Sequence, residues 1–234
     1  MLPVAILAGG RATRLRPLTE TIPKAMVEVR GEPFAFHQLR LLRRRGVERV
    51  VYCVGYRGEQ VVDAVGDGAR FGLQVRYSFD GPELLGTAGA LKIAGPLLGP
   101  DFFVLYGDSY LDCDYAAVER AYRQAGKPAL MAVFRNDGQW DTSNVEFADG
   151  RIIAYSKAHR TERMRHIDYG LGVLCAGVVA PVPGDRPTDL AAIYEQLAAS
   201  DELAAFEVSQ RFYEVGSFAG LEQFEDYLKR VDPR

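Results

Sequence analysis

The sequence predicts a doubly wound α/β fold in which a mostly parallel sheet is covered by helices. Short β-branched segments alternate with amphipathic segments through the first 135 residues, which is the pattern of successive strand–helix–strand units. Of the 234 residues, 48% are hydrophobic and 25% are charged, so the chain can bury a large core. We expect a single domain over residues 1–234, with a Rossmann-like core (1–135), a small β-rich lobe (136–185) and closing helices (186–234).

The first half of this core is expected to contain three strands and two helices. Val4–Ala8 and Arg49–Val54 are short, apolar and rich in β-branched residues, as buried parallel strands are. Phe34–Arg45 lies between them and carries apolar residues at helical spacing. Gly58–Val65 is expected to form a short helix, and Leu73–Phe79 the third strand.

The second half of the core repeats the alternation. Thr87–Ala94 is expected to be a helix, and the apolar segment Phe102–Tyr106 a buried strand. Tyr115–Ala125 is a further helix, for which Asp114 is the expected N-cap because its carboxylate can accept from the backbone N–H groups of the first turn. Ala129–Phe134 completes the core strands.

The pattern changes after residue 135. Asn144–Phe147 and Arg151–Lys157 flank a turn that ends in a glycine, which predicts a β-hairpin, and Tyr169–Val179 is expected to add strand. A helix is expected over Asp189–Ala198. The closing helix, near residues 218–231, has apolar residues at helical spacing.

Composition excludes several classes of protein. The net charge of -3 gives no general electrostatic attraction for nucleic acid or an anionic membrane. The longest apolar stretch, Leu171–Val182, is too short to span a bilayer, and the first residues lack a signal-peptide pattern. Three scattered cysteines favour neither disulfides nor a zinc site. We therefore expect a cytoplasmic protein without nucleic-acid or membrane partners. Self-association into a homo-oligomer is left open.

The segment with the clearest chemistry follows the first strand. It runs Leu7, Ala8, Gly9, Gly10, Arg11, Ala12, Thr13, Arg14, and Lys24 lies shortly beyond it, followed by the strand-like segment Ala25–Val29. A glycine-rich turn at the carboxyl end of a strand lets backbone N–H groups approach phosphate, and nearby cations can neutralise it. The segment has neither the P-loop pattern nor G-x-G-x-x-G. Two glycines alone would be equally compatible with an ordinary strand–helix turn.

Three further segments accompany the turn with Pro23-Lys24 in chain order. They are Leu85–Leu91 (Leu-Gly-Thr-Ala-Gly-Ala-Leu), the turn Tyr106–Ser109 and Tyr213–Ser217. Together the four segments extend over nearly the whole chain, and they resemble the sugar-1-phosphate nucleotidylyltransferase family, the last of them more weakly. Among short members, the chain looks most like heptose 1-phosphate guanylyltransferases and N-acetylmuramate 1-phosphate uridylyltransferases.

The resemblance implies a reaction of a nucleoside triphosphate with a sugar 1-phosphate, giving a nucleotide sugar and pyrophosphate with Mg²⁺ as cofactor. Arg14, Lys24 and Asp108 would be catalytic, and Asp108 and Glu214 would bind the metal. Direct displacement at phosphorus needs positioning, a divalent cation and positive charge on the leaving group, and these side chains can supply them. Asp108 follows the apolar strand ending at Tyr106, where α/β sheets bind ligands.

The remaining site residues are also implied by the resemblance. The nucleotide-binding set is Leu7, Ala8, Gly9, Gly10, Arg11, Ala12, Thr13, Arg14, Gly86, Thr87 and Gly107, and the sugar-phosphate set is Asn144, Lys157, Asp168 and Gly170. Ala12 replaces a family glycine, which is tolerable only if its φ stays below zero. Ser156 and Asp168 depart from the usual sugar contacts. The identities of the sugar and of the base therefore stay open. The resemblance to short family members suggests GTP and a heptose 1-phosphate.

Two other functions compete with this one. Asp112-Cys113-Asp114 spells the D-x-D metal motif of nucleotide-sugar glycosyltransferases, although Asp114 is the expected helix cap. A non-catalytic nucleotide-sugar-binding protein is the second alternative. Retention of Arg14 and Lys24 favours the nucleotidylyltransferase, because neither competitor needs to neutralise a triphosphate.

Overall fold

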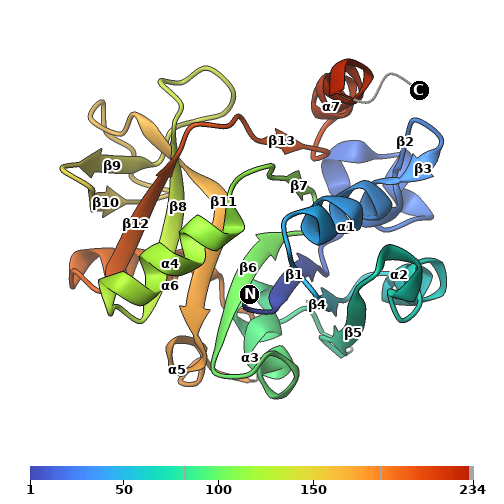
Figure 1. Ribbon diagram of the computed structural model, residues 1–234, viewed down its shortest axis with the longest axis horizontal. Coiled ribbons are helices and arrows are strands. Elements are labelled where there is room, and N and C mark those ends of the chain that lie inside the picture. Colours follow the sequence, from blue (N-terminus) through green and yellow to red (C-terminus); the bar gives the residue numbers. More distant parts are fainter. Residues whose placement is uncertain (82, 185, 232–234) are drawn as a thin grey trace.

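A computed structural model describes residues 1–81, 83–184 and 186–231, and confirms the α/β fold class (Figure 1). Nine strands of the described residues form one mixed sheet, in the order β10-β9-β11-β6-β1-β4-β5, with β8 paired to β11 and β12 paired to β8. These strands are β1 (Val4–Ala8), β4 (Arg49–Val54), β5 (Gln74–Phe79), β6 (Asp101–Tyr106), β8 (Ala129–Arg135), β9 (Val145–Ala148), β10 (Arg151–Tyr155), β11 (His166–Cys175) and β12 (Leu203–Val208).

The centre of the sheet is parallel and places a crevice beside β1. β1 pairs in parallel with β4 on one side, where Val4 faces Val50, and with β6 on the other, where Val4 faces Phe103. The chain first moves outward through β4 to β5 and then returns to β6. This reversal makes the carboxyl ends of β1 and β6 a topological switch point, which is where open α/β sheets bind ligands.

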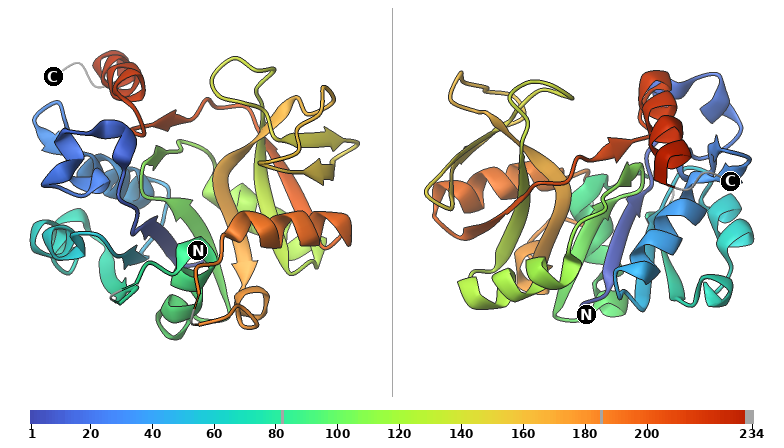
Figure 2. Two further views of the ribbon diagram at one scale, coloured as in Figure 1. Left: turned by 180° about the vertical axis from the view of Figure 1, so that it is seen from behind. Right: turned by 45° about the horizontal axis from the view of Figure 1, so that its top comes forward.

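Helices cover both faces of the sheet because successive strand residues point to opposite sides. Ile6 belongs to the core cluster that contains residues of α1, α2 and α4, whereas Ala5 belongs to the cluster that contains residues of α3, α5 and α6. Figure 2 shows α6, in orange, in front of the strands when the molecule is seen from behind. These helices are α1 (Phe34–Arg44), α2 (Gly58–Val65), α3 (Gly86–Leu98), α4 (Tyr115–Ala125), α5 (Ala176–Val179) and α6 (Leu190–Ala199).

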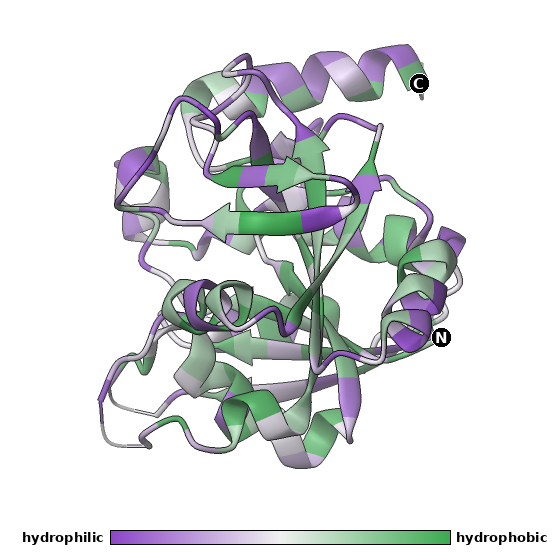
Figure 3. Ribbon diagram, turned by 90° about the vertical axis from the view of Figure 1, so that its left-hand side faces the viewer, coloured by the Kyte–Doolittle hydropathy of each residue, from purple (hydrophilic) through white to green (hydrophobic). Residues whose placement is uncertain are grey.

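The carboxyl-terminal helix packs on a third core cluster. α7 (Phe218–Val231) contributes the fully buried Phe224, whose ring lies 5.4 Å from that of Phe34 and 4.7 Å from that of Tyr110. Hydrophilic and hydrophobic residues alternate along α7, as expected of a helix with one buried face (Figure 3). No helix of the described residues is both long and apolar enough to span a membrane.

Short elements connect this frame. Two small sheets pair β2 (Glu28–Val29) with β3 (Glu32–Pro33) and β7 (Ser109–Tyr110) with β13 (Tyr213–Glu214). The 3₁₀ turns are η1 (Thr13–Leu15), η2 (Leu18–Glu20), η3 (Lys24–Met26) and η4 (Ala69–Phe71).

Two segments have a different secondary structure from the one expected, and one strand was not expected. The segment after Lys24, expected to be strand-like, begins with η3, in which the Met26 N–H donates to the Pro23 carbonyl over 2.9 Å. The strand expected over Tyr169–Val179 ends at Cys175, and α5 follows. β12 was not predicted, because its sequence Leu-Ala-Ala-Phe-Glu-Val is poor in β-branched residues; it is a strand because it pairs in parallel with all but the last residue of β8.

Candidate active site

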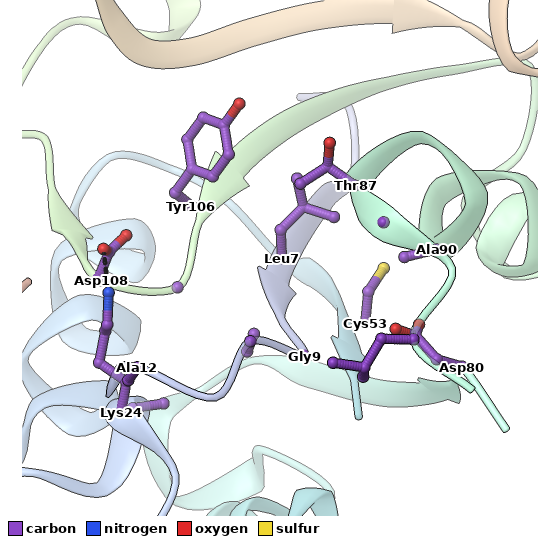
Figure 4. Close-up of a pocket in the computed structure, with 16 residues that line it drawn as sticks. Leu7, Gly9, Ala12, Lys24, Cys53, Asp80, Thr87, Ala90, Tyr106 and Asp108 are labelled. Atoms are coloured by element: carbon purple, nitrogen blue, oxygen red, sulfur yellow. Dashed lines mark hydrogen bonds and ion pairs between the residues drawn. The ribbon is translucent and has the colours of Figure 1, made fainter. Parts of the chain in front are cut away.

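A cavity of about 260 Å³ lies at the switch point, between the carboxyl ends of β1 and β6 and the start of α3 (Figure 4). It is lined by Leu7, Ala8, Gly9, Gly10, Ala12, Lys24, Ala25, Cys53, Asp80, Leu84, Gly86, Thr87, Ala90, Tyr106, Gly107 and Asp108. Ten of the nucleotide-binding and catalytic residues predicted from the sequence belong to this lining. Three others, Arg11, Thr13 and Arg14, do not line it.

Gly107 lets the end of β6 pass close to β1. Its N–H donates to the Leu7 carbonyl over 2.9 Å, and a Cβ atom at this position would lie 2.9 Å from the same carbonyl oxygen. A side chain at residue 107 would therefore force the two strand ends apart. The close approach places Asp108, the next residue, in the same cavity lining as the glycine-rich turn.

Ala12 does not have the φ below zero on which its tolerance was expected to depend. It adopts the left-handed conformation, with φ 48° and ψ 48°. Such a conformation costs a residue with a Cβ about 1–2 kcal/mol. The carbonyl of Ala12 accepts hydrogen bonds from the Thr19 hydroxyl at 2.7 Å and from the Leu15 N–H at 3.2 Å. These bonds hold the strained turn in place, although residue 12 carries a Cβ atom.

The predicted catalytic side chains come together at one edge of the cavity. Lys24 Nζ lies 2.6 Å from Asp108 Oδ2, although the two residues are far apart in the sequence. A Cβ atom built on Gly216 would lie 3.3 Å from Arg14 Nη2, 3.6 Å from Asp108 Oδ2 and 3.8 Å from Lys24 Nζ. Two cations and a carboxylate therefore surround one point, and only the lack of a side chain at Gly216 leaves that point open.

Glu214 provides a second carboxylate beside Asp108. In the β7–β13 pair it lies opposite Ser109, and the N–H of Val215 donates to the Asp108 carbonyl over 2.9 Å. Burial and the negative charge of Asp108 raise the pKa of Glu214 from 4.5 to about 7. The oxygens of two neighbouring carboxylates are ligands that suit a divalent cation such as Mg²⁺. The charge of the cation would reduce the repulsion between the two carboxylates.

Arg14 and Glu214 also line a neighbouring cavity of about 250 Å³. Its wall includes Trp140 and Arg211, whose guanidinium carbon lies 3.4 Å from the centre of the Trp140 ring. Arg14 is exposed, and no ion pair among the described residues involves it. Its guanidinium is therefore available to an anionic ligand.

The start of α3 is fixed by contacts with the segment before α6. Gly86 has φ +73°, and a Cβ atom there would lie only 2.5 Å from the Thr188 carbonyl oxygen. The Thr87 hydroxyl donates to Asp189 Oδ1 over 2.9 Å and accepts from the Leu190 N–H at 2.7 Å. The Ala88 N–H also donates to the Thr188 carbonyl over 3.0 Å, and together these contacts hold the helix start against the wall of the cavity.

The four residues predicted to bind the sugar phosphate lie outside the cavity lining but next to one another. The amide oxygen of Asn144 accepts from the Asp168 N–H at 2.9 Å, and Asp168 Oδ1 accepts from the Gly170 N–H at 3.0 Å. Lys157 Nζ lies 5.9 Å from the centre of the Tyr106 ring, which lines the cavity. The Tyr106 hydroxyl is buried and has no hydrogen-bond partner among the described residues.

Several cavity residues were not predicted from the sequence, among them Cys53, Asp80 and Tyr106. Cys53 is the penultimate residue of β4, Asp80 directly follows β5, and Tyr106 ends β6. The carboxyl ends of parallel strands meet at the same edge of the sheet, and this rule, which singled out Asp108, would also have found Asp80.

The D-x-D motif has structural contacts at both carboxylates. Asp112 accepts from the Arg45 guanidinium and, over 3.3 Å, from the Tyr227 hydroxyl. Asp114 is the N-cap of α4, as predicted, and accepts from the Ala117 N–H at 2.9 Å. Neither residue lines the cavity at the switch point.

Comparison with known sequences gives a consistent set of relatives. The family model described as Nucleotidyl transferase matches residues 4–143, more than half of the chain. A UTP–glucose-1-phosphate uridylyltransferase of Synechocystis sp. is 30% identical over 201 residues, covering 79% of this chain and 52% of its own. An N-acetylmuramate alpha-1-phosphate uridylyltransferase of Neisseria meningitidis is 41% identical over 113 residues, covering 48% and 49%. The chain thus spans about half the length of these curated relatives.

Solved structures share the fold across the whole chain. HddC from Yersinia pseudotuberculosis, complexed with GMP-PN, has a TM-score of 0.80 at 24% identity and covers 98% of this chain and 100% of its own. A putative glucose-1-phosphate thymidylyltransferase from Bacillus anthracis has a TM-score of 0.86 at 19% identity, covering 99% and 97%.

Proposed function

The chain belongs to the nucleotidyl transferase family, as its motifs predicted, and from this premise we propose that it joins a nucleoside triphosphate to a sugar 1-phosphate. The products are a nucleotide sugar and pyrophosphate. The observation that carries the proposal is the convergence of Arg14, Lys24 and Asp108 around the open point at Gly216. Such a cluster suits the charge that develops on a triphosphate when it reacts.

The chemistry is a direct displacement. A phosphate oxygen of the sugar 1-phosphate attacks the α-phosphorus, and the bond from that phosphorus to the α,β-bridging oxygen breaks, so that pyrophosphate leaves with the electron pair. The protein needs no covalent intermediate. Arg14 neutralises the departing pyrophosphate, Lys24 holds the α-phosphate region, and the backbone of the Gly9–Ala12 turn orients the nucleotide.

Asp108 and Glu214 are the residues that would hold Mg²⁺. No cluster of three or more His, Cys, Asp or Glu side chains that could hold a metal ion occurs in the described part of the chain. One or two carboxylates plus substrate phosphates is a usual way for proteins to bind Mg²⁺. When bound, the ion supplies charge neutralisation at the phosphates. Lys24 forms an ion pair with Asp108 at 2.6 Å and thereby neutralises the charge of one of the two carboxylates.

The sugar phosphate is proposed to lie on the other side of Tyr106. Lys157 would neutralise its phosphate, and Asn144, Asp168 and Gly170 would form the wall of the sugar site. GTP and a heptose 1-phosphate are the substrates that we propose first. The short family members that the motifs resemble support this choice, as does the GMP-PN bound in the HddC complex. Ser156 stands where a sugar-contacting glutamate is usual, so other sugars belong in the test.

A matrix of substrates tests the proposal. Purified protein is incubated with Mg²⁺ and with each pair drawn from the common nucleoside triphosphates and several sugar 1-phosphates, and released pyrophosphate is measured. We expect pyrophosphate to be released with at least one pair, and only when both substrates of that pair are present. Binding of a nucleotide sugar without release from any pair would favour the non-catalytic alternative. Consumption of a nucleotide sugar by glycosyl transfer would favour the glycosyltransferase.

A further inference from the structure

The cavity lined by Arg14 and Arg211, which we call the second cavity, adjoins the first one at Gly216. Gly216 belongs to the lining of the second cavity, whereas Lys24 and Asp108 belong to the lining of the first. Lys24 Nζ and Asp108 Oδ2 nevertheless lie 3.8 and 3.6 Å from the position of a Cβ atom on Gly216. A triphosphate whose α-phosphate is held by Lys24, as the proposed function requires, therefore has the second cavity beside its β- and γ-phosphates.

Arg211 brings a cation to the second cavity, and its neighbours leave that charge unbalanced. Its guanidinium carbon lies 3.4 Å from the centre of the Trp140 ring and 4.7 Å from that of Tyr213, and its Nη2 donates to the Gln223 amide oxygen. Its Nε is buried without a hydrogen-bond partner in the part of the chain that the structure describes. No ion pair found there involves Arg211. Burial and the positive charge of Arg230 lower the pKa of Arg211, so an anion beside it would stabilise its charge.

The Trp140 ring is a fixed platform for this guanidinium. Arg211 lies in the segment between β12 and β13, which runs in red from the β-rich lobe toward α7 in Figure 1, and Trp140 lies between β8 and β9. The Trp140 N–H donates to Asn136 Oδ1 over 3.2 Å, and the Asn136 amide donates to Ser143 Oγ over 3.1 Å. These bonds fix the backbone of the Trp140 loop, and the stacked ring then holds Arg211 at the cavity wall.

We propose that the second cavity holds the β- and γ-phosphoryl groups of the bound triphosphate and that Arg211 binds them together with Arg14. This inference rests on the proposed function and adds to it a residue outside the four motif segments. When a sugar-phosphate oxygen bonds to the α-phosphorus, the bond to the α,β-bridging oxygen breaks, and its electron pair goes to the pyrophosphate. An arginine stays charged and can donate two parallel hydrogen bonds to such phosphate oxygens. Asp141 and Glu214 also line the cavity, so the phosphoryl groups should bind as their Mg²⁺ complex.

Trp140 is the single tryptophan of the chain, so its fluorescence reports on the second cavity without any variant. Inorganic pyrophosphate with Mg²⁺ is titrated into the unmodified protein, and the titration is repeated with GMP, UMP and dTMP. We expect a saturable change in Trp140 fluorescence with pyrophosphate and none with the monophosphates, which lack β- and γ-phosphoryl groups. No response to pyrophosphate, or an equal response to a monophosphate, would overturn the inference.

The variant Arg211→Gln makes the test specific to one side chain. It removes the charged donor, so calorimetry should show that Mg²⁺-pyrophosphate binds about 10- to 100-fold more weakly. Arg230→Gln is the matched control, because Arg230 is exposed on α7, lies outside the cavity lining and still places a positive charge near Arg211. It should weaken binding by less than about twofold, since solvent and salt screen exposed charges. Equal losses in the two variants would contradict a direct contact from Arg211, and the fluorescence comparison decides the matter if Arg211→Gln does not fold.

The outcomes separate this inference from the proposed function. An Arg211→Gln protein that keeps both its affinity for pyrophosphate and its kcat/KM for an active substrate pair would refute the role of Arg211, while the activity itself would support the transferase. Failure of the unmodified protein to release pyrophosphate from any substrate pair would overturn the proposed function and this inference with it.

Discussion

At the scale of single residues, the site is a balance of charges held in a small space. Lys24 and Arg14 bring two positive charges to the point where Asp108 and Glu214 bring two negative ones. Lys24 and Asp108 form an ion pair with both side chains about one-fifth exposed, whereas burial and the charge of Asp108 raise the pKa of Glu214 to about 7. The anions and the cation of a metal–triphosphate complex would each meet a side chain of opposite charge in this cluster.

The Arg14 guanidinium is the first residue to test. Arg14→Ala should lower kcat/KM for the substrate pair that releases pyrophosphate by about 100- to 1,000-fold, because it removes a donor aimed at developing charge. Arg16→Ala, an exposed arginine two residues away, is the control and should keep nearly full activity. Urea unfolding should give similar midpoints for both. Comparable activity losses in the two variants would contradict a specific role for Arg14.

Glu214 gives the folded protein a dependence on pH. Its pKa is 4.5 when unperturbed and about 7 in the fold, so the folded state binds this proton more tightly than the unfolded chain does. Its contribution is therefore fully favourable below about pH 4.5 and is lost as the pH rises to about 7, after which the loss is constant. Glu214→Gln, which resembles the protonated form, should unfold at higher urea than the unmodified protein at pH 8 and at a similar concentration at pH 4. An unchanged pH dependence in the variant would contradict this assignment.

At the scale of elements, the shape of the cavity at the switch point depends on where α3 begins. The helix was predicted to start at Thr87, but it starts at Gly86, whose positive φ and contact with Thr188 set the direction of the first turn. Because Thr87 bonds to Asp189 and Leu190, the first turns of α3 and α6 are tied together. One wall of the cavity is thus determined by residues about one hundred positions apart.

Gly86→Ala should break this junction. The new methyl group meets a backbone oxygen at 2.5 Å, and the left-handed backbone is strained for alanine, so we expect a loss of about 2–4 kcal/mol in the free energy of unfolding. Nucleotide affinity should also fall, since the helix start moves. Gly184→Ala, at an exposed glycine with open space around it, should change stability by less than about 0.5 kcal/mol. Urea unfolding and calorimetric titration measure both effects; equal, small changes would show that the junction tolerates a side chain.

At the scale of the whole molecule, the last helix holds the second carboxylate in place. Strand β13, which carries Glu214, pairs only briefly with β7, but the next residue, Val215, is fully buried in the cluster that α7 forms with α1 and β7. The carboxyl-terminal segment therefore completes a site that begins with the turn after β1. α7 lies beside the amino-terminal elements β2, β3 and α1 in the ribbon views (Figure 1).

Phe224→Ala tests this tether. Removing a fully buried ring that contacts Phe34 and Tyr110 should lower the free energy of unfolding by about 3–5 kcal/mol. Phe218→Ala, in the same helix but 53% exposed, should change it by less than about 0.5 kcal/mol. Urea unfolding followed by tryptophan fluorescence gives both values. A loss for Phe224→Ala no larger than that for Phe218→Ala would mean that α7 does not stabilise the rest of the chain.

Much of the fold followed from local patterns. β1, β4, α2 and α4 have the predicted bounds, because a buried parallel strand or an amphipathic helix can be recognised from a short stretch of sequence. β12 could not be found in this way. Its residues favour a helix as much as a strand, and its partner β8 lies about seventy residues earlier.

The sequence by itself determined the family, the order of the central strands and helices, and the glycine-rich turn with its cations, since all of these depend on residue type and short spacing. Only the tertiary structure decided that Arg14, Lys24 and Asp108 surround one point with Glu214 close to them, that Ala12 is left-handed, and that Asp80 faces the cavity. The physical reason is that distances between strand ends, and the burial that shifts the pKa of Glu214, arise from packing between segments far apart in the chain.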